Sequence, residues 1–228
     1  LVLVYVHSIL NRAFYGVPLF TNSEGLHTNA VFGFLNILFK LIDDEKPDYL
    51  AIAFDVHQLT FRHEMFKDYK GTRKPMLPEL REQVPVIKEL LHKMNITTIE
   101  LPGFEADDVI GTMSKIGEDA GMDVCVFSGD RDLLQLASDK VMICIPKTKK
   151  GQTTVEKYKT EEVKELYKVT PVEFIDVKAL MGDSSIIYRG FRELAKRVPQ
   201  LLLNSLVLLK MPMSTQKKSV TSVIKLRY

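Results

Sequence analysis

The sequence predicts an α/β protein with a central, mostly parallel sheet flanked by helices. Two observations support this fold class. Short, β-type apolar runs alternate along residues 1–185 with longer helical patterns, which is the order of βαβ units. The runs are also apolar at nearly every position, as in parallel strands that are buried on both faces.

The first three elements are a strand, a helix and a strand. Residues 1–6 (LVLVYV) form a continuous apolar run, and residues 29–46 form a helical pattern that is apolar on most sides. Pro47 ends this helix because proline cannot continue it. Residues 49–54 (YLAIAF) predict the second buried strand, which leads directly to Asp55.

The middle of the chain continues the alternation. Residues 78–95 predict a helix in spite of Pro85, and residues 97–101 predict a short strand. The helix over 107–121 is expected to end at a C′ glycine, Gly121. Residues 122–128 (MDVCVFS) then predict another buried strand.

The last well-punctuated elements are a short helix at 131–137, a strand at 140–145 and two helices. The final helix opens on Thr170-Pro171-Val172-Glu173. This is a capping box with proline at the first helical position, and it marks the start of that helix.

Composition narrows the class of protein. The chain has 228 residues, of which 46% are hydrophobic and 26% charged, and no stretch approaches the roughly 20 apolar residues of a membrane span. Its two cysteines, Cys125 and Cys144, lie in apolar runs and are expected to be buried free thiols of a reducing, cytoplasmic compartment. The sequence begins inside the first strand, so we expect a fragment of a longer chain.

The net charge of +2 conceals an asymmetry along the chain. Residues 186–228 carry nine Lys or Arg and one Glu (+8), whereas residues 1–185 carry 22 basic and 28 acidic side chains (−6). The later stretch also lacks convincing periodicity and capping signals. We therefore expect one α/β domain over 1–185 and a distinct, basic tail over 186–228.

Acidic residues gather where the predicted strands and helices meet. The set comprises Asp55, Glu105, Asp107, Asp108, Asp130, Asp132 and Asp183. The carboxyl ends of parallel strands share one edge of a sheet, where ligands bind, so most of these side chains are expected to converge. A single acid of this kind is commonly a helix cap or a solvated turn residue. Together, oxygen ligands without His or Cys favour magnesium or manganese, and two such ions are suited to phosphodiester chemistry.

A long basic stretch with aromatic residues follows Asp55. This stretch, residues 56–78 and here called the basic segment, reads VHQLTFRHEMFKDYKGTRKPMLP. Its cations suit a phosphate backbone, and aromatic rings such as that of Tyr69 suit unstacked bases. The alternative is a solvated, flexible insertion. His63 has no metal-ligand spacing, so we interpret it as structural or phosphate-facing.

Other chemistries have less support. The sequence has neither a GxxxxGK[ST] loop nor a GxGxxG fingerprint, which disfavours ATP-driven and dinucleotide chemistry. An aspartyl-phosphate receiver domain also clusters acids at strand ends. It needs only about three acids and no basic segment, so the segment argues against it.

Several of these motifs together resemble a known family. The stretches TNSEGLHTNAVFGF, PDYLAIAFD, TFRHEMFKDYKGTRKPMLPEL, GFEADDVIGT, SGDRDLLQL and ALMGDSS are similar to the N-terminal 5′→3′ exonuclease domain of bacterial DNA polymerases I, part of the flap endonuclease family. The resemblance covers residues 1–185. It implies a PIN-like, resolvase-like domain crowned by a helical arch that cuts DNA at 5′ ends and flaps with two magnesium ions.

The resemblance also implies roles for individual residues. The seven acids listed above would hold the metal ions. Lys70 and Arg73 would be arch residues that grip the scissile phosphate, and Arg12 and Arg62 would hold the flanking backbone. The family carries a polymerase domain in the same chain. We expect a monomer that acts on DNA and has no membrane partner.

Two departures from the family pattern bear on activity. The family's first strand ends in Asp-Gly-Asn, whose Asp is a metal ligand, and the matching residues here are Tyr5, Val6 and His7. A phenol is a poor substitute for a carboxylate at neutral pH. We therefore expect impaired cleavage, and the alternative from another class is a non-catalytic, nucleic-acid-binding pseudo-nuclease.

The second departure is the tail. The family continues after MGDSS with Asp-Asn-Ile-Pro-Gly-Val-Pro-Gly-Ile-Gly-Glu-Lys, a helix-hairpin-helix that clamps duplex DNA. Residues 186–197 read IIYRGFRELAKR, and each of these positions is compatible with the family codons read one nucleotide late. We interpret the tail as a frameshift product that replaces the duplex clamp.

Overall fold

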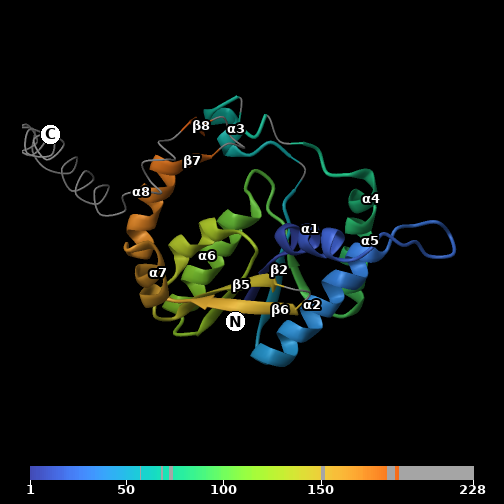
Figure 1. Ribbon diagram of the computed structural model, residues 1–228, viewed down its shortest axis with the longest axis horizontal. Helices are drawn as coiled ribbons and strands as arrows, with labels where there is room; N and C mark the ends of the chain where they lie inside the picture. The colour runs from blue at the N-terminus through green and yellow to red at the C-terminus, as the bar shows by residue number, and fades with distance from the viewer. Residues whose placement is uncertain (57, 68, 72–73, 150–151, 184–187, 190–228) are drawn as a thin grey trace, which may run out of the picture.

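Residues 1–56, 58–67, 69–71, 74–149, 152–183 and 188–189 are described by a computed structural model of the chain (Figure 1). The main strands are β1 (Val2–Tyr5), β2 (Leu50–Ala53), β3 (Thr97–Ile99), β4 (Val124–Phe127), β5 (Val141–Lys149) and β6 (Gln152–Tyr158). The helices are α1 (Val6–Gly16), α2 (Asn29–Glu45), α3 (Phe61–Met65), α4 (Pro78–Arg81), α5 (Gln83–Lys93), α6 (Ala106–Asp119), the 3-10 helix η1 (Arg131–Leu136), α7 (Thr160–Tyr167) and α8 (Pro171–Met181). A small hairpin, β7 (Gly182–Asp183) and β8 (Tyr188–Arg189), follows α8.

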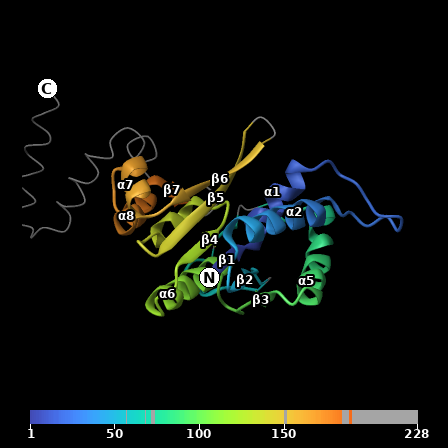
Figure 2. The ribbon, with the colours of Figure 1, turned by 90° about the horizontal axis from the view of Figure 1, so that it is seen from below.

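Within the described residues, a six-stranded sheet has the order β3-β2-β1-β4-β5-β6, which Figure 2 shows from its edge. β1 pairs in parallel with β2 on one side and with β4 on the other, and only β6 runs antiparallel, against β5. The chain therefore builds outward from β1 in one direction and then switches to the other side. In such a sheet the ligand site lies at the carboxyl ends of the strands beside this switch point.

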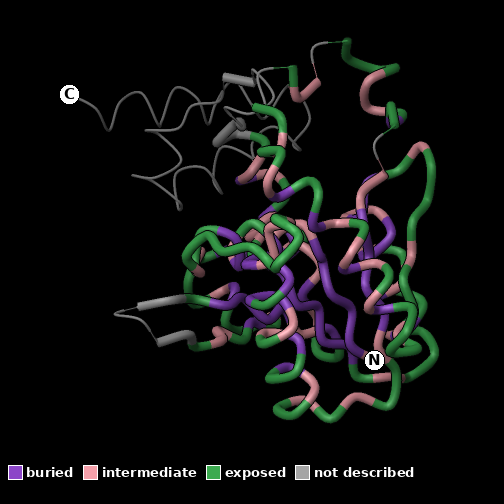
Figure 3. Tube along the Cα trace, turned by 90° about the vertical axis from the view of Figure 1, so that its right-hand side faces the viewer, coloured by how far each residue is buried: buried purple, intermediate pink, exposed green. Residues whose placement is uncertain are grey.

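Both faces of the sheet are covered, which explains why its strands are apolar at successive positions. Side chains of β1 alternate between the two cores: Val2 and Val4 pack with α1, α2 and α5, whereas Leu3 and Tyr5 pack with α6, η1 and α8. Figure 1 shows these two groups of helices on opposite sides of the sheet, and in Figure 3 the buried strands run through the centre of the molecule.

The structure confirms the α/β class and most of the predicted elements. Gly121 adopts a positive φ of 83° after α6, and Thr170 and Glu173 exchange backbone-to-side-chain hydrogen bonds of 2.9 and 3.2 Å at the start of α8. Cys125 and Cys144 are buried free thiols. Across the described ranges, no helix has the length and apolar character needed to span a membrane. The boundary at 185/186 and the tail from residue 190 onward lie outside the described residues.

Besides the short α3, β7 and β8, two elements of the central sheet and its flanking helices were not predicted. α1 starts at Val6, directly after β1, so the run LVLVYV is divided between a strand and a helix. β6 is the other, and its sequence QTTVEKY is too polar to resemble a buried strand. As the antiparallel partner of β5 at the edge of the sheet, it does not need the fully apolar pattern.

Candidate active site

The candidate site lies at the carboxyl ends of β2, β3 and β4, beside the switch point of the sheet. Asp55 follows β2, Glu105 is the N-cap of α6 after β3, and Asp130 is the N-cap of η1 after β4. The parallel register brings these turns to the same edge, as predicted. Asp107 is the acid that the other three surround, and their negative charges all act on it.

The surroundings of Asp107 disfavour its charged form. Its Oδ1 is buried and has no hydrogen-bond partner among the residues that the structure describes. Burial, followed by the negative charges of Asp130, Asp55 and Glu105, raises the pKa of Asp107 to about 7. Crowding of this degree exceeds what a helix cap requires, because a cap needs only one carboxylate that accepts backbone N–H bonds.

The other two acids at the start of α6 are neutralised by the basic segment. The Arg62 guanidinium donates to both Asp108 oxygens, at 2.6 and 2.7 Å, and these bonds hold the pKa of Asp108 below its ordinary value. Lys70 Nζ donates to Glu105 Oε1 at 2.9 Å, and the Tyr69 hydroxyl donates to Oε2 at 3.1 Å. Burial and the charge of Glu105 raise the pKa of Tyr69, so it remains a neutral donor. Arg62, Tyr69 and Lys70, which were predicted to contact DNA, thus bind the acids of the site.

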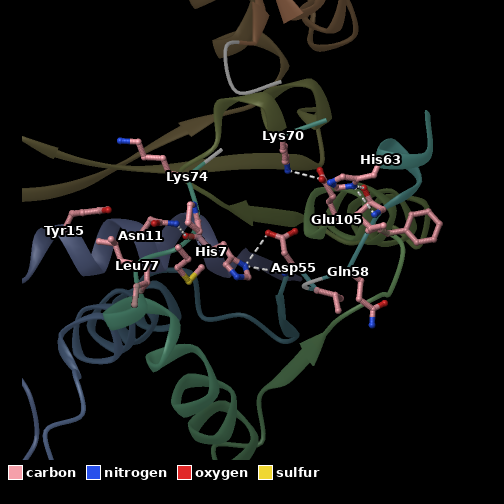
Figure 4. A pocket seen from close by; sticks show the side chains of 17 residues that line it. His7, Asn11, Tyr15, Asp55, Gln58, His63, Lys70, Lys74, Leu77 and Glu105 are labelled. Atoms are coloured by element: carbon pink, nitrogen blue, oxygen red, sulfur yellow. Dashed lines mark hydrogen bonds and ion pairs between the residues drawn. The ribbon is translucent and has the colours of Figure 1, made fainter. Parts of the chain in front are cut away.

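Asp55 is held differently, by groups of β1, α1 and α6. Its Oδ1 accepts the Ala106 backbone N–H at 2.8 Å, and its Oδ2 accepts the Tyr5 hydroxyl at 2.8 Å. His7 Nδ1 lies 3.4 Å from the same Oδ2 (Figure 4). Both oxygens of Asp55 are therefore engaged.

The remaining predicted acids differ in their surroundings. Asp130 Oδ1 accepts the Asp132 backbone N–H at 2.9 Å, whereas the Asp132 carboxylate forms an ion pair with Lys178 of α8 at 2.7 Å. Asp183 belongs to β7, but its side chain lies outside the described residues.

A cavity of about 660 Å³ opens beside Asp55 and Glu105. Lys70 and Lys74 of the basic segment line this cavity together with His7, Asn11 and Tyr15 of α1, and Figure 4 shows Lys70 beside Glu105 and Lys74 near the α1 residues. The contribution of α1 was not predicted from the sequence, because that helix was not expected. Its residues His7, Asn11 and Tyr15 follow one another at intervals of four, a helical spacing that could have revealed this shared face.

The other residues assigned to DNA are only partly placed. Arg12 lies in α1, and burial lowers its pKa from the ordinary value. Arg73 lies outside the described residues. His63 contacts the Thr60 backbone N–H and hydroxyl through Nδ1, at 3.1 and 3.0 Å, and so fixes the start of α3. That position agrees with the structural interpretation of His63.

The arrangement can be compared with what a divalent cation needs. Among the residues with described side chains, no three of the His, Cys, Asp and Glu groups are positioned to hold a metal ion. The chemistry of the set nevertheless fits a hard cation, because it is made of carboxylate oxygens. The partnerless Asp107 oxygen is an atom that such a cation would satisfy.

Comparison with known proteins identifies related sequences. A model of the family described as "5'-3' exonuclease, N-terminal resolvase-like domain" matches residues 1–168. DNA polymerase I of Bacillus subtilis (strain 168) is 54% identical over 185 residues, and that of Bacillus caldotenax is 49% identical over 185 residues. Each alignment covers 81% of this chain and 21% of the relative, so the chain spans about a fifth of the length of these relatives.

Solved structures share the fold at lower identity. The T5 5′-exonuclease, solved with divalent metal ions (zinc), has a TM-score of 0.67 and 22% identity, covering 95% of this chain and 82% of its own. Human GEN1, in complex with Holliday junction DNA, has a TM-score of 0.59 and 15% identity, covering 98% of this chain and 55% of its own. At these identities the likeness is one of fold, and it confirms the resolvase-like architecture.

Proposed function

The chain belongs to the family of 5′–3′ exonuclease N-terminal, resolvase-like domains, and from this membership we propose that it is a metal-dependent hydrolase of DNA phosphodiesters at 5′ ends and 5′ flaps. The observation that carries the proposal is the buried, partnerless oxygen of Asp107 among three other carboxylates, faced by cations of the basic segment. Carboxylates that hold cations and cations that hold phosphates are the two parts that phosphodiester hydrolysis requires.

The metal would be magnesium or manganese, with two ions in the complete family site. Its ligands would come from the acidic set defined above: Asp55, Glu105, Asp107, Asp108, Asp130, Asp132 and Asp183. A divalent cation bound there supplies Lewis acidity toward a phosphate and lowers the pKa of a coordinated water. The chain's own contribution is to hold its carboxylates at one edge of a rigid sheet.

The DNA contacts would come from the basic segment and α1. Lys70 and Arg73 would grip the phosphate at the cleavage point, and Arg62 and Arg12 would hold neighbouring phosphates. Lys70 and Arg62 now neutralise Glu105 and Asp108, so a metal ion that takes over these carboxylates would free both cations for phosphate. Tyr69 would offer an aromatic face to an unstacked base.

The biological setting follows from the relatives. They are DNA polymerases I of bacteria, and a polymerase domain normally accompanies this domain in one chain. We place the substrate among the 5′ ends and flaps formed in DNA replication and repair, in the bacterial cytoplasm, and we expect the domain to act as a monomer.

A second candidate is a non-catalytic nucleic-acid-binding module. The specific observation that favours it is the Tyr5 hydroxyl bonded to Asp55, at the position where the family has a metal-ligating Asp. One ligand is thereby lost and a second is occupied. We accordingly expect weak cleavage compared with an intact member of the family.

A flap-cleavage assay separates the two candidates. A DNA duplex with a labelled 5′ flap is incubated with the chain in manganese or in EDTA, and binding is measured in parallel by fluorescence anisotropy. Slow cleavage that requires metal and is lost in Asp107→Asn is expected. Binding without any metal-dependent product would instead support the non-catalytic module.

A further inference from the structure

Tyr5, the last residue of β1 and its one aromatic residue, lies at the switch point of the sheet. The side chain is buried, with 6% of the residue exposed, and packs with Ala53 and Ala106 in the core on the α6 side. β1 and β2 pair in parallel with Tyr5 opposite Ala53, so Asp55 lies two residues beyond that partner. Alternation along the strand directs both Tyr5 and Asp55 toward the α6 side. The 2.8 Å hydrogen bond between them follows from this register.

With the Tyr5 hydrogen bond, both carboxylate oxygens of Asp55 accept hydrogen bonds from the protein itself. One oxygen is fixed by the backbone of α6 through Ala106, and the other is fixed by Tyr5 with His7 beside it. The two donors, the Tyr5 hydroxyl and the Ala106 N–H, belong to a strand end and to the first turn of a helix, and His7 Nδ1 in turn accepts the Asp55 backbone N–H at 3.3 Å. These two donors cannot swing away as a long side chain can.

The neighbouring acids contrast with this arrangement. Glu105 is held by Lys70, and Asp108 by Arg62, two long side chains from the basic segment. A cation that enters the site can displace such partners by rotation of their side chains. Asp107 offers a free oxygen already. Asp55 is thus the acid of the group that is least able to turn toward a cation.

We propose that the Tyr5 hydroxyl withholds Asp55 from the metal site and thereby weakens binding of a divalent cation to the remaining carboxylates. The inference rests on the proposed metal-dependent function. It assigns to Tyr5 the role of a positioning residue that sets metal affinity through Asp55. Removing the hydroxyl while keeping the ring frees Asp55 Oδ2 of its donor.

Manganese binding to the whole chain, measured by isothermal titration calorimetry, tests the proposal without relying on cleavage. Tyr5→Phe is expected to bind Mn²⁺ on the order of ten-fold more tightly, the effect of one hydrogen bond to a charged group. The matched control is Tyr49→Phe, because Tyr49 is 61% exposed and lies just before β2, at the opposite end of the sheet from Asp55. Its affinity should equal that of the unmodified chain.

A double-mutant cycle identifies Asp55 as the mediator. Asp55→Asn should change the Mn²⁺ affinity less than two-fold in the unmodified chain, because Asp55 is withheld there. The same change should weaken affinity about ten-fold in the Tyr5→Phe background. Equal effects of Asp55→Asn in both backgrounds would overturn the proposal. If Tyr5→Phe fails to fold, a large effect of Asp55→Asn in the unmodified chain would overturn it in the same way.

Asp107→Asn distinguishes this proposal from the proposed function. Mn²⁺ binding that depends on Asp107 but is identical in the unmodified chain and Tyr5→Phe would refute the role of Tyr5 alone. Absence of any Asp107-dependent binding, in both backgrounds, would refute the metal site on which the proposed function also depends.

Discussion

At the scale of single residues, repulsion among neighbouring carboxylates in the candidate site is only partly compensated by positive charge. Glu105, Asp107 and Asp108 occupy the N-cap and first turn of α6, where the helix dipole favours negative charge. The dipole and the cations Arg62 and Lys70 compensate two of these acids, but the buried Asp107 Oδ1 has no partner within the described part of the chain. A residue in this condition lowers the stability of the metal-free fold.

Asp107→Asn should therefore stabilise the chain in EDTA at pH 8, because an amide removes the charge that burial and three neighbouring acids oppose. A gain of about 1 kcal/mol would raise the Tm by roughly 2–4 °C in a chain of this size. The same variant should lose the rise in Tm that Mn²⁺ causes in the unmodified chain by mass action. Asp43→Asn, an exposed change in α2, is the control and should alter neither value. A lower Tm for Asp107→Asn in EDTA would contradict this account.

The acids of the site could be predicted from the sequence, but the contact between Tyr5 and Asp55 could not. The pattern identified Asp55, Glu105, Asp107 and Asp130 because carboxylates after apolar strands are visible in the sequence, and the structure brings these four together. The resemblance to the family showed that Tyr5 stands where a metal-ligating Asp is expected. It could not predict that the hydroxyl reaches Asp55, because that contact depends on the pairing of Tyr5 with Ala53 across two strands.

At the scale of elements, the site depends on how closely α1 approaches α2. α1 carries His7, Asn11 and Tyr15 to the cavity and packs against α2 through Gly33. A Cβ at Gly33 would lie 2.9 Å from the Ala13 Cβ and 3.0 Å from Val17 Cγ2. The absence of a side chain at Gly33 is thus a packing requirement of this helix pair.

Two glycine-to-alanine changes should consequently have opposite effects on the free energy of unfolding. Gly33→Ala should destabilise by about 1–2 kcal/mol, because overpacking outweighs the gain in helix propensity. Gly111→Ala in α6 should stabilise by roughly 0.5–1 kcal/mol, because its Cβ would meet Leu136 at an ordinary 3.6 Å. Urea denaturation measures both values. Equal effects of the two changes would show that α1 and α2 separate without cost.

The elements were predicted to different extents for physical reasons. Buried parallel strands are apolar throughout, so β1, β2 and β4 are evident in the sequence. α1 is hidden because Val6 continues the apolar run of β1 into the helix. β6 is hidden because a strand with an antiparallel partner at the sheet edge tolerates a polar sequence.

The basic segment should carry the salt-dependent part of DNA affinity. Each phosphate that Arg62 or Lys70 neutralises releases counterions. Arg62→Ala with Lys70→Ala should therefore flatten the plot of log K against log salt by roughly one unit per lost contact. Anisotropy with a 5′-flap DNA in EDTA measures this slope. Lys93→Ala with Lys115→Ala removes equal charge from exposed helix positions as the control. An unchanged slope would show that the segment is only a solvated loop.

At the scale of the whole molecule, the two departures from the family lie in different parts of the chain. Tyr5, Val6 and His7 form the corner between β1 and α1, which lies within the described residues. Of the tail after Ser185, the structure describes only β8 (Tyr188–Arg189), and residues 186–187 and 190–228 lie outside the described residues. Activity should need both regions, since one concerns the metal site and the other the grip on duplex DNA.

Repairing both regions should produce strong cleavage, and repairing either one should not. Tyr5→Asp with Val6→Gly and His7→Asn returns the family motif, and removing the one-nucleotide shift after codon 185 returns the helix-hairpin-helix sequence. The motif repair supplies a carboxylate beside Asp55 but leaves the duplex unclamped, so we expect only a small gain in manganese-dependent flap cleavage. Because Val6 is fully buried in α1, Val6→Gly will lower stability, so the Tm of each variant is measured together with its cleavage rate.

Asp107→Asn in the doubly repaired chain is the control and should abolish the product. Strong cleavage after the motif repair alone would show that the tail matters little, whereas no cleavage after both repairs would contradict the frameshift interpretation.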